Sequence, residues 1–182
     1  MAHLTMDQLV AGQDAVVDSP ADNGTLELLV ARPGVDQRDV LDSGELVVGE
    51  GLAGDNYVER GNPRAADGNA DPEAQLNVMN SRAIDLVADG DRERWPLAGD
   101  QLFVDLDLSV ANLPTGTRLA IGTAVIEVSA KPHTGCAKFA KRFGLDAAKW
   151  ANSDPERRYR GINAIVVEGG SLKPGDTITK LG

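Results

Sequence analysis

The sequence is poor in cysteine, histidine and aromatic residues. It has one cysteine, two histidines and 4% aromatic residues in a chain of 182 residues. A single cysteine excludes an intramolecular disulfide and fits a reducing compartment. One cysteine and two histidines also fall short of the four ligands that a structural zinc site takes. Because no apolar run approaches the length of a membrane-spanning helix, and the first residues lack the features of a signal peptide, we expect a cytoplasmic protein outside the membrane.

Positive charge is scarce as well. The chain has 18 Lys and Arg residues against 28 Asp and Glu residues, which gives a formal net charge of -10. Nucleic-acid-binding modules gain most of their affinity by neutralising phosphates, so this balance argues against one. A small anionic ligand is still compatible with the composition, because a pocket needs only a few well-placed cations. With 42% hydrophobic and 25% charged residues, the composition is globular, and we expect a single domain over residues 1–182.

Short apolar runs that end at glycine or proline turns indicate a mainly β protein. The predicted strands are residues 25–30, 45–48, 75–79, 118–121, 124–128 and 162–167. Helix signals are fewer, and they predict short helices at residues 80–88, 137–143 and 146–150. Many short strands joined by tight turns are typical of a β-barrel or sandwich.

The one cysteine lies in a segment that is rich in positive charge. Cys136 is predicted at the junction of a turn and a helix, with His133 three residues before it. The nearby cations are Lys131, Lys138, Lys141 and Arg142. Free N–H groups at a helix start and nearby cations stabilise a thiolate, which can attack an electrophile, carry a persulfide or bind a soft metal. The alternatives are a buried, inert cysteine and a histidine that is hydrogen-bonded within a turn.

A glycine-rich segment allows a functional and a structural interpretation. Gly49, Gly51 and Gly54 match the pattern G-x-G-x-x-G, but no helix follows them, which argues against a Rossmann dinucleotide site. The glycines form either a loop whose backbone approaches a ligand or a purely structural turn. In the first case Asp55 is an acceptor or a structural anchor.

Arginine is concentrated once more towards the end of the chain. Arg157, Arg158 and Arg160 flank Tyr159 and precede the last long predicted strand. They either help to bind an anion or form a solvated face on an acidic protein. We favour the solvated face.

Several short motifs follow one another from about residue 25 to the end of the chain. They are GLAGD at residues 51–55, QLNVM at 75–79, LPTGTRLAIG at 113–122, VIEV at 125–128, GC at 135–136, RFG at 142–144, RGINA at 160–164 and GGSLKPGD at 169–176. In this order and spacing they resemble a stand-alone MOSC domain. The family takes its name from the C-terminal domain of molybdenum cofactor sulfurases.

The resemblance implies a mainly β, barrel-like fold of the MOSC type with a few short helices, and the binding of molybdenum cofactor. This cofactor is a pterin dithiolene that carries a phosphate. The resemblance also implies that Cys136 receives sulfur or contacts molybdenum, and His133 is the second catalytic candidate. The expected cofactor-binding residues are Gly54 and Asp55 in a closing loop, Thr134, and Lys131, Lys138 and Arg142, of which the three cations are candidates for the phosphate.

The sequence departs from the family pattern at two points. It lacks the aminotransferase-like part that holds pyridoxal phosphate in full-length sulfurases, so we expect no site for that cofactor. Residues 99–102 read Gly-Asp-Gln-Leu, where related stand-alone proteins often have Gly-Glu-Asn-Leu, and no ligand role is assigned there.

Three functions stay open at this level. The first is an enzyme that transfers sulfur or reduces N-hydroxylated substrates with molybdenum. The second is a non-catalytic carrier or storage protein for the cofactor, and the third is a MOSC scaffold that holds another ligand. A reductase needs an electron donor protein, because the sequence has neither an iron–sulfur cysteine set nor a flavin fingerprint. Sulfur transfer needs a sulfur donor, because the sequence lacks the aminotransferase-like part that mobilises sulfur.

Overall fold

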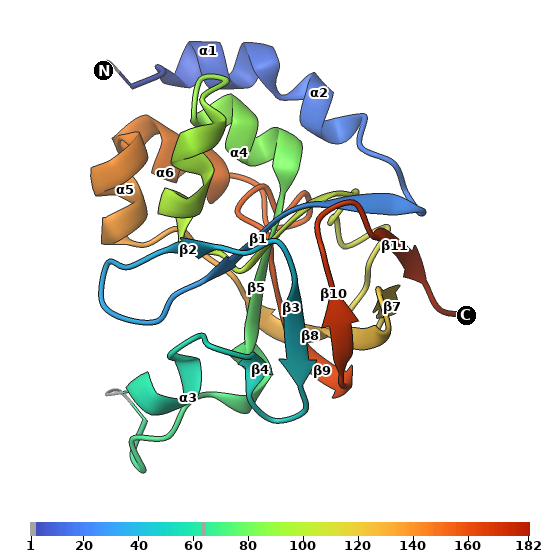
Figure 1. Cartoon of the computed structure of the whole chain (residues 1–182). Coiled ribbons are helices and arrows are strands. Elements are labelled where there is room, and N and C mark those ends of the chain that lie inside the picture. Colours follow the sequence, from blue (N-terminus) through green and yellow to red (C-terminus); the bar gives the residue numbers. More distant parts are fainter. Residues whose placement is uncertain (1–2, 63–64) are drawn as a thin grey trace.

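The chain folds around a closed β-barrel of seven strands in the computed structural model, which describes residues 3–62 and 65–182 (Figure 1). The barrel strands are β1 (Gly24–Ala31), β5 (Leu76–Asn80), β6 (Leu102–Asp105), β7 (Arg118–Ile121), β8 (Ala124–Pro132), β9 (Ile162–Glu168) and β11 (Thr177–Lys180). Their order is β11–β7–β8–β9–β5–β6–β1, and β1 pairs with β11 to close the barrel. β5 and β6 are parallel, whereas the other barrel pairs are antiparallel.

Short strands extend this barrel at its edge. β2 (Asp39–Val40) pairs with the end of β1. A separate sheet consists of β3 (Gly44–Val47), β4 (Gly51–Leu52) and β10 (Gly170–Leu172). The loop between β1 and β2 therefore projects from the barrel with both ends held by strand pairing, and it later contributes to the functional site.

β1 separates two apolar cores, one inside the barrel and one outside it. Leu26 and Leu29 belong to the inner core, whereas Leu28 and Val30 belong to the outer core. Strict alternation would put Leu26 and Leu28 on the same face, but the pairing of β1 with β6 shifts register between these residues. The bulge thus lets a single leucine-rich strand serve both cores.

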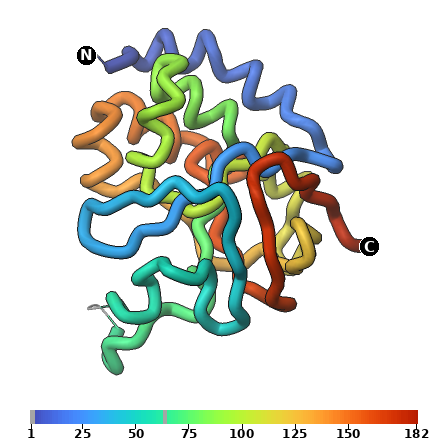
Figure 2. The backbone as a smooth tube through the Cα atoms, in the orientation of Figure 1, coloured from blue at the N-terminus to red at the C-terminus, as the bar shows by residue number. Residues whose placement is uncertain are grey.

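Helices cover the outer core on one side of the barrel (Figure 1). They are α1 (Met6–Gly12), α2 (Asp14–Val17), α4 (Ser81–Val87), α5 (Ala137–Phe143), α6 (Leu145–Ala151) and the 3-10 helix η2 (Arg92–Ala98). α3 (Tyr57–Arg60) and the 3-10 turn η1 (Pro72–Ala74) lie apart from this group. Figure 2 shows the N-terminal segment beside α5 and α6, and the backbone N–H of Met6 donates to Asp146 Oδ2 at 3.2 Å.

The structure confirms the mainly β barrel and each of the predicted strands and helices, with ends that move by a few residues. It adds elements that were not predicted, which are α1, α2, α3, β2, β4, β6, β10, β11 and the 3-10 helices η1 and η2. Within the described residues, none of the helices has the length and apolar character needed to cross a membrane.

Asn80 joins the barrel to the helical layer. Its Oδ1 accepts from the backbone N–H of Ala83 at 3.0 Å and so caps α4. Its Nδ2 donates to Ser19 Oγ and to the carbonyl of Leu106, both at 2.8 Å. One buried amide therefore satisfies polar groups of three segments.

We expect Asn80→Ala to lower the free energy of unfolding by about 2 to 3 kcal/mol, because the helix loses its cap and the Leu106 carbonyl stays buried without its donor. Urea denaturation followed by circular dichroism measures the change. Thr5→Ala is the control, because Thr5 caps the exposed start of α1. A loss for Asn80→Ala no larger than that for Thr5→Ala would contradict the proposed importance of the buried amide.

Candidate functional site

Cys136 lies where the sequence predicted, immediately before α5. It is the N-cap residue of that helix, and its side chain is exposed and not in a disulfide. Asn152, at the end of α6, binds Gly135, the residue that precedes Cys136. Its Oδ1 accepts from the backbone N–H of Gly135 at 2.8 Å, and its Nδ2 donates to the Gly135 carbonyl at 3.3 Å. Because one side-chain amide binds both backbone groups of Gly135, α6 fixes the turn that presents the thiol.

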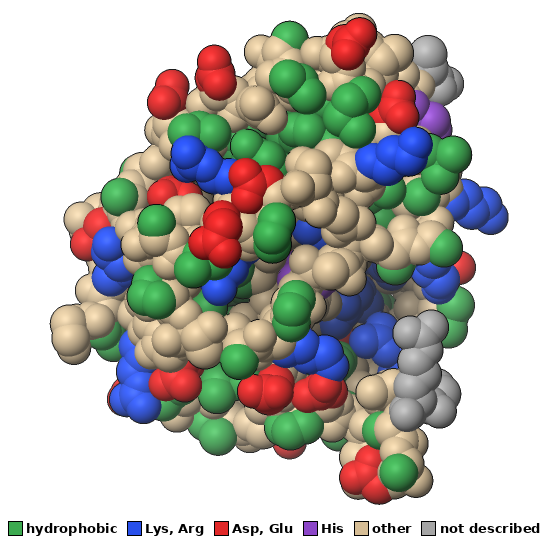
Figure 3. All heavy atoms as spheres, turned by 180° about the vertical axis from the view of Figure 1, so that it is seen from behind, with side chains coloured by type: hydrophobic (Ala, Val, Ile, Leu, Met, Phe, Trp, Pro, Cys, Tyr) green, Lys and Arg blue, Asp and Glu red, His purple; other side chains and the backbone are tan. Residues whose placement is uncertain are grey.

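A cleft rich in positive charge opens beside Cys136, and we call it the basic cleft. Figure 3 shows Lys and Arg side chains gathered round a hollow on this face of the molecule. Among the described residues that line it, the cations are Arg32, Arg38, Arg60, Lys138, Arg142 and Arg160, and the one acid is Asp36. His133, Thr134 and Cys136 line the same cleft. The fold therefore collects cations from both halves of an acidic chain around the thiol.

Arg32 forms the floor of the basic cleft and is held by Asp55. Its Nε and Nη2 donate to Asp55 at 2.7 and 3.0 Å, and its Nη1 donates to Asn77 Oδ1 at 2.9 Å. The side chain of Asp55 is 1% exposed, and it also accepts from Tyr57 N. Asp55 thus anchors Arg32 from beneath, while Gly54 lies on an exposed loop and is not part of the cleft lining.

Arg38 and Arg60 have no acidic partner in the part of the chain that the structure describes. Arg38 donates to the carbonyls of Pro96 and Gln37, and Arg60 lies over the ring of Tyr57. Burial lowers the pKa of Arg38, and the charges of Arg142 and Arg32 lower it further. Burial and then Arg32 lower the pKa of Arg60. The charge of Arg32 thus acts unfavourably on both guanidinium groups, so an anion in the basic cleft would be stabilised.

The predicted phosphate ligands divide into two groups. Lys138 and Arg142 line the basic cleft, and both pair with Asp36 Oδ1, at 3.3 and 2.6 Å. Lys131 pairs with Asp71 and lies outside the lining of the cleft. Two of the three cations are thus beside Cys136, and each of the three already has an acidic partner.

His133 belongs to a buried network with Asp100 and Arg160. His133 Nε2 lies 2.8 Å from Asp100 Oδ1, and Arg160 Nη1 lies 2.8 Å from both oxygens of Asp100. The Asp100 side chain is 0% exposed. Burial acts to raise the pKa of Asp100, but Arg160 and then His133 hold it well below its usual range. Asp100 is therefore a buried carboxylate at neutral pH.

The protonation of His133 follows from this network. Burial and then the charge of Arg160 lower the pKa of His133, against the opposing effect of Asp100. The ring is therefore neutral at pH 7. Because an ionised carboxylate only accepts, Nε2 carries the proton and donates to Asp100, which leaves Nδ1 as the basic nitrogen.

The prediction of a solvated face at residues 157–160 is wrong for Arg160. This residue is 4% exposed and lies 4.8 Å above the ring of Phe139, whereas Arg157 is exposed and Arg158 is half-buried. The motif RGINA, quoted for the family resemblance, contains Arg160 and was the available signal. Arg32, Arg38 and Arg60 were missed because each is isolated in the sequence and only folding brings them together.

The comparisons with known proteins agree with this fold. A family model for the MOSC domain matches residues 65–179. Among solved structures, the YuaD protein from Bacillus subtilis is 17% identical, with a TM-score of 0.64 over 86% of this chain and 94% of that one. YiiM from Escherichia coli is 20% identical, with a TM-score of 0.55 over 87% of this chain and 70% of that one. At these identities the solved structures show the fold alone, and no curated protein sequence matches the chain.

We expect the stability of the protein to fall as the pH drops from about 7 to about 5, because the neutral form of His133 is favoured in the folded state. A lowered folded-state pKa gives stability that is complete above the ordinary histidine pKa of about 6.5 and is lost as the pH falls through the folded-state pKa. Because one proton is involved, the free energy of unfolding changes by at most about 1.4 kcal/mol per pH unit. Urea denaturation at a series of pH values measures this slope.

His133→Gln should remove the part of the pH dependence of stability that comes from His133, while the glutamine amide can still donate a hydrogen bond to Asp100. His3→Gln changes the exposed second histidine and is the matched control, for which we expect the dependence to remain. If the wild type and His133→Gln had the same slope between about pH 7 and pH 5, the assignment of a neutral His133 in the folded state would be refuted.

Proposed function

The chain belongs to the MOSC domain family, which is generally linked to molybdenum cofactor, and from this premise we propose that it binds the cofactor in the basic cleft. In this proposal Cys136 is the ligand of molybdenum or the carrier of sulfur. The observation that carries the proposal is an exposed thiol on the wall of a cleft whose arginines outnumber its acids.

The residues of the basic cleft fit the chemistry of such a cofactor. A pterin phosphate is an anion, and Arg38 and Arg60 are guanidinium groups that lack an acidic partner in the described part of the chain. A bidentate guanidinium is well suited to phosphate. Molybdenum in a dithiolene is thiophilic, and Cys136 offers a sulfur that no other group occupies. Both ends of the cofactor thus have a partner of matching chemistry.

The protein's own groups would have distinct roles in this site. Arg38, Arg60 and Arg142 would bind the phosphate, while Arg32 holds the floor of the cleft through its pair with Asp55. His133 would accept a proton at Nδ1, because Nε2 is committed to Asp100. The cofactor, when bound, supplies a redox-active metal, and a reductase role therefore also needs a protein that donates electrons.

The first test is the cofactor content of the purified protein. We expect the wild type, produced in a host rich in molybdenum cofactor, to contain near-stoichiometric molybdenum and pterin. Cys136→Ser should lose molybdenum or its bound sulfur while the phosphate contacts keep much of the pterin. Arg38→Gln should lower the content of both by about tenfold, because a charge-assisted contact with the phosphate is lost. Metal analysis and fluorescence of the oxidised pterin measure the two components.

Arg118→Gln is the control, because Arg118 on β7 forms an exposed pair with Glu127 on β8 and is not part of the lining of the basic cleft. Absence of molybdenum and pterin from the folded wild type would contradict the proposal and favour another ligand on the same scaffold. If cofactor binds, turnover with an electron or sulfur donor separates an enzyme from a carrier, since a carrier gives only stoichiometric transfer.

Asp36 is expected to compete with the phosphate for two of its ligands. It pairs with both Lys138 and Arg142 from the loop between β1 and β2. The pair with Lys138, and then the charge of Arg142, lower the pKa of Asp36, so it is ionised at neutral pH. We therefore expect Asp36→Asn to increase the affinity for inorganic phosphate about two- to fivefold, as appropriate for exposed pairs.

Phosphate titration followed by nuclear magnetic resonance of the arginine side chains measures this change. Asp39→Asn removes a carboxylate from the nearby strand β2 and is the control. Unchanged or weaker phosphate binding by Asp36→Asn would show that Asp36 supports the site rather than competing with the anion.

A further inference from the structure

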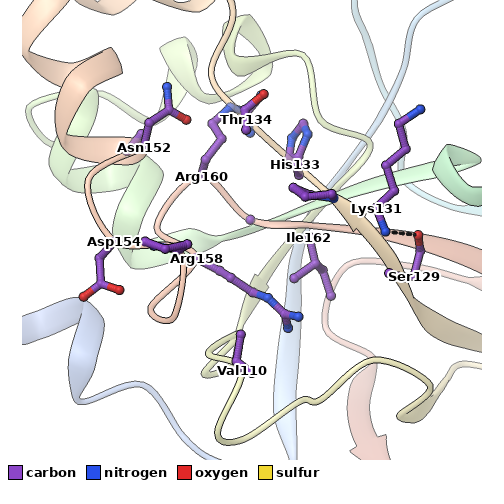
Figure 4. Close-up of a pocket in the computed structure, with 15 residues that line it drawn as sticks. Val110, Ser129, Lys131, His133, Thr134, Asn152, Asp154, Arg158, Arg160 and Ile162 are labelled. Atoms are coloured by element: carbon purple, nitrogen blue, oxygen red, sulfur yellow. Dashed lines mark hydrogen bonds between the residues drawn. The ribbon is translucent and has the colours of Figure 1, made fainter.

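A second cavity lies next to the basic cleft, and we call it the side cavity. His133, Thr134 and Arg160 line both, whereas Val110, Arg158 and Ile162 line only the side cavity (Figure 4). Its volume is about 210 Å³. Because pockets for drug-sized molecules span roughly 300 to 1,000 Å³, a volume of this size limits the occupant to a small molecule.

The walls of the side cavity are mainly apolar. They include Val110, Ala151, Pro155 and Ile162. Two of the charged groups at its edge are engaged elsewhere. Asp154 Oδ1 accepts from the backbone N–H groups of Glu156 and Arg157 at 2.9 and 3.0 Å, and its carboxylate points away from Arg158 in Figure 4. The amine of Lys131 pairs with Asp71.

Arg160, the third charged group of the lining, pairs with Asp100, so Arg158 is the charged side chain that remains available in this cavity. Figure 4 shows its side chain reaching between Val110 and Ile162. Nη1 donates to the carbonyls of Leu113 and Leu108, at 2.7 and 3.4 Å. Within the described residues, Nε and Nη2 make no hydrogen bond and no acid forms an ion pair with the guanidinium. A half-buried cation thus keeps two parallel donors for a ligand.

We infer that the side cavity binds a small organic carboxylate, with the apolar body against Val110 and Ile162 and the carboxylate on Arg158. Two parallel N–H donors of a guanidinium match the two oxygens of a carboxylate. A single available cation with apolar walls suits a monoanion better than a phosphate, which carries more charge and more acceptor oxygens. The inference is independent of the proposed cofactor, since none of the side cavity's carboxylate contacts lies in the basic cleft.

Benzoate is the probe for the test, and benzamide is its neutral counterpart of the same shape. We titrate each into the purified full chain without cofactor and follow backbone amide shifts by nuclear magnetic resonance. We expect saturable shifts with benzoate around residues 129–134 and 158–162, and binding of benzamide about tenfold weaker, because the charge-assisted bond is lost.

Two variants test the site in different ways. Arg158→Gln should weaken benzoate binding about tenfold, and Arg157→Gln, which changes the exposed neighbour, should leave it unchanged. Because Arg158 also bonds two carbonyls, its loss can disturb the loop. Val110→Phe therefore serves as the second variant, since it fills the cavity and leaves the bonds of Arg158 in place; it should abolish saturable binding.

The inference is overturned if benzoate does not bind the folded wild type, or if binding survives both Arg158→Gln and Val110→Phe. It is also overturned if benzoate instead shifts the amide resonances of residues that line the basic cleft, and Arg38→Gln abolishes these resonance shifts. Because cofactor content and phosphate binding report on the basic cleft, a failure there leaves the benzoate result standing, and the reverse also holds.

Discussion

The candidate site depends on one carboxylate that does not reach solvent. Asp100 lies between η2 and β6, and it binds Arg160 just before β9 and His133 just after β8. It therefore joins three segments that are far apart in the sequence. Removing one partner of a buried charge pair typically costs about 3 to 5 kcal/mol, because the other charge is left without compensation. The segment that carries Cys136 begins at this network, so the position of the thiol is set by a contact beneath the surface.

The charges of the basic cleft are arranged so that its positive potential is not cancelled. Asp55 neutralises Arg32 through a buried pair, and Asp36 is shared between Lys138 and Arg142. The carbonyl partners of Arg38 carry no net charge. A cleft with this surplus of cations on a chain of net charge -10 attracts a small anion while the rest of the surface repels polyanions. On this argument we expect the chain to favour a small phosphate over nucleic acid.

Local sequence was sufficient for the six predicted strands and for the position of Cys136, but it was not sufficient for most of the site. Residues 25–30 and 162–167 became β1 and β9 because apolar runs between turns specify strands locally. α1 was missed although Thr5 and Gln8 form a capping box, which is a readable signal. β6 was missed because no glycine or proline turn ends its apolar run. The arginines of the cleft and Asp100 could not be assigned, since their roles arise from contacts between distant segments.

The two cavities meet at the short segment that follows β8. His133 and Thr134 contribute to both walls, and Arg160 supports that segment through Asp100. A ligand in either cavity therefore contacts residues that also face the other one, which allows the two binding events to be coupled. By thermodynamic linkage the effect on affinity is the same in both directions. The buried network resists movement of the segment that follows β8, since any displacement of His133 stretches its hydrogen bond to a carboxylate that has no solvent to replace it.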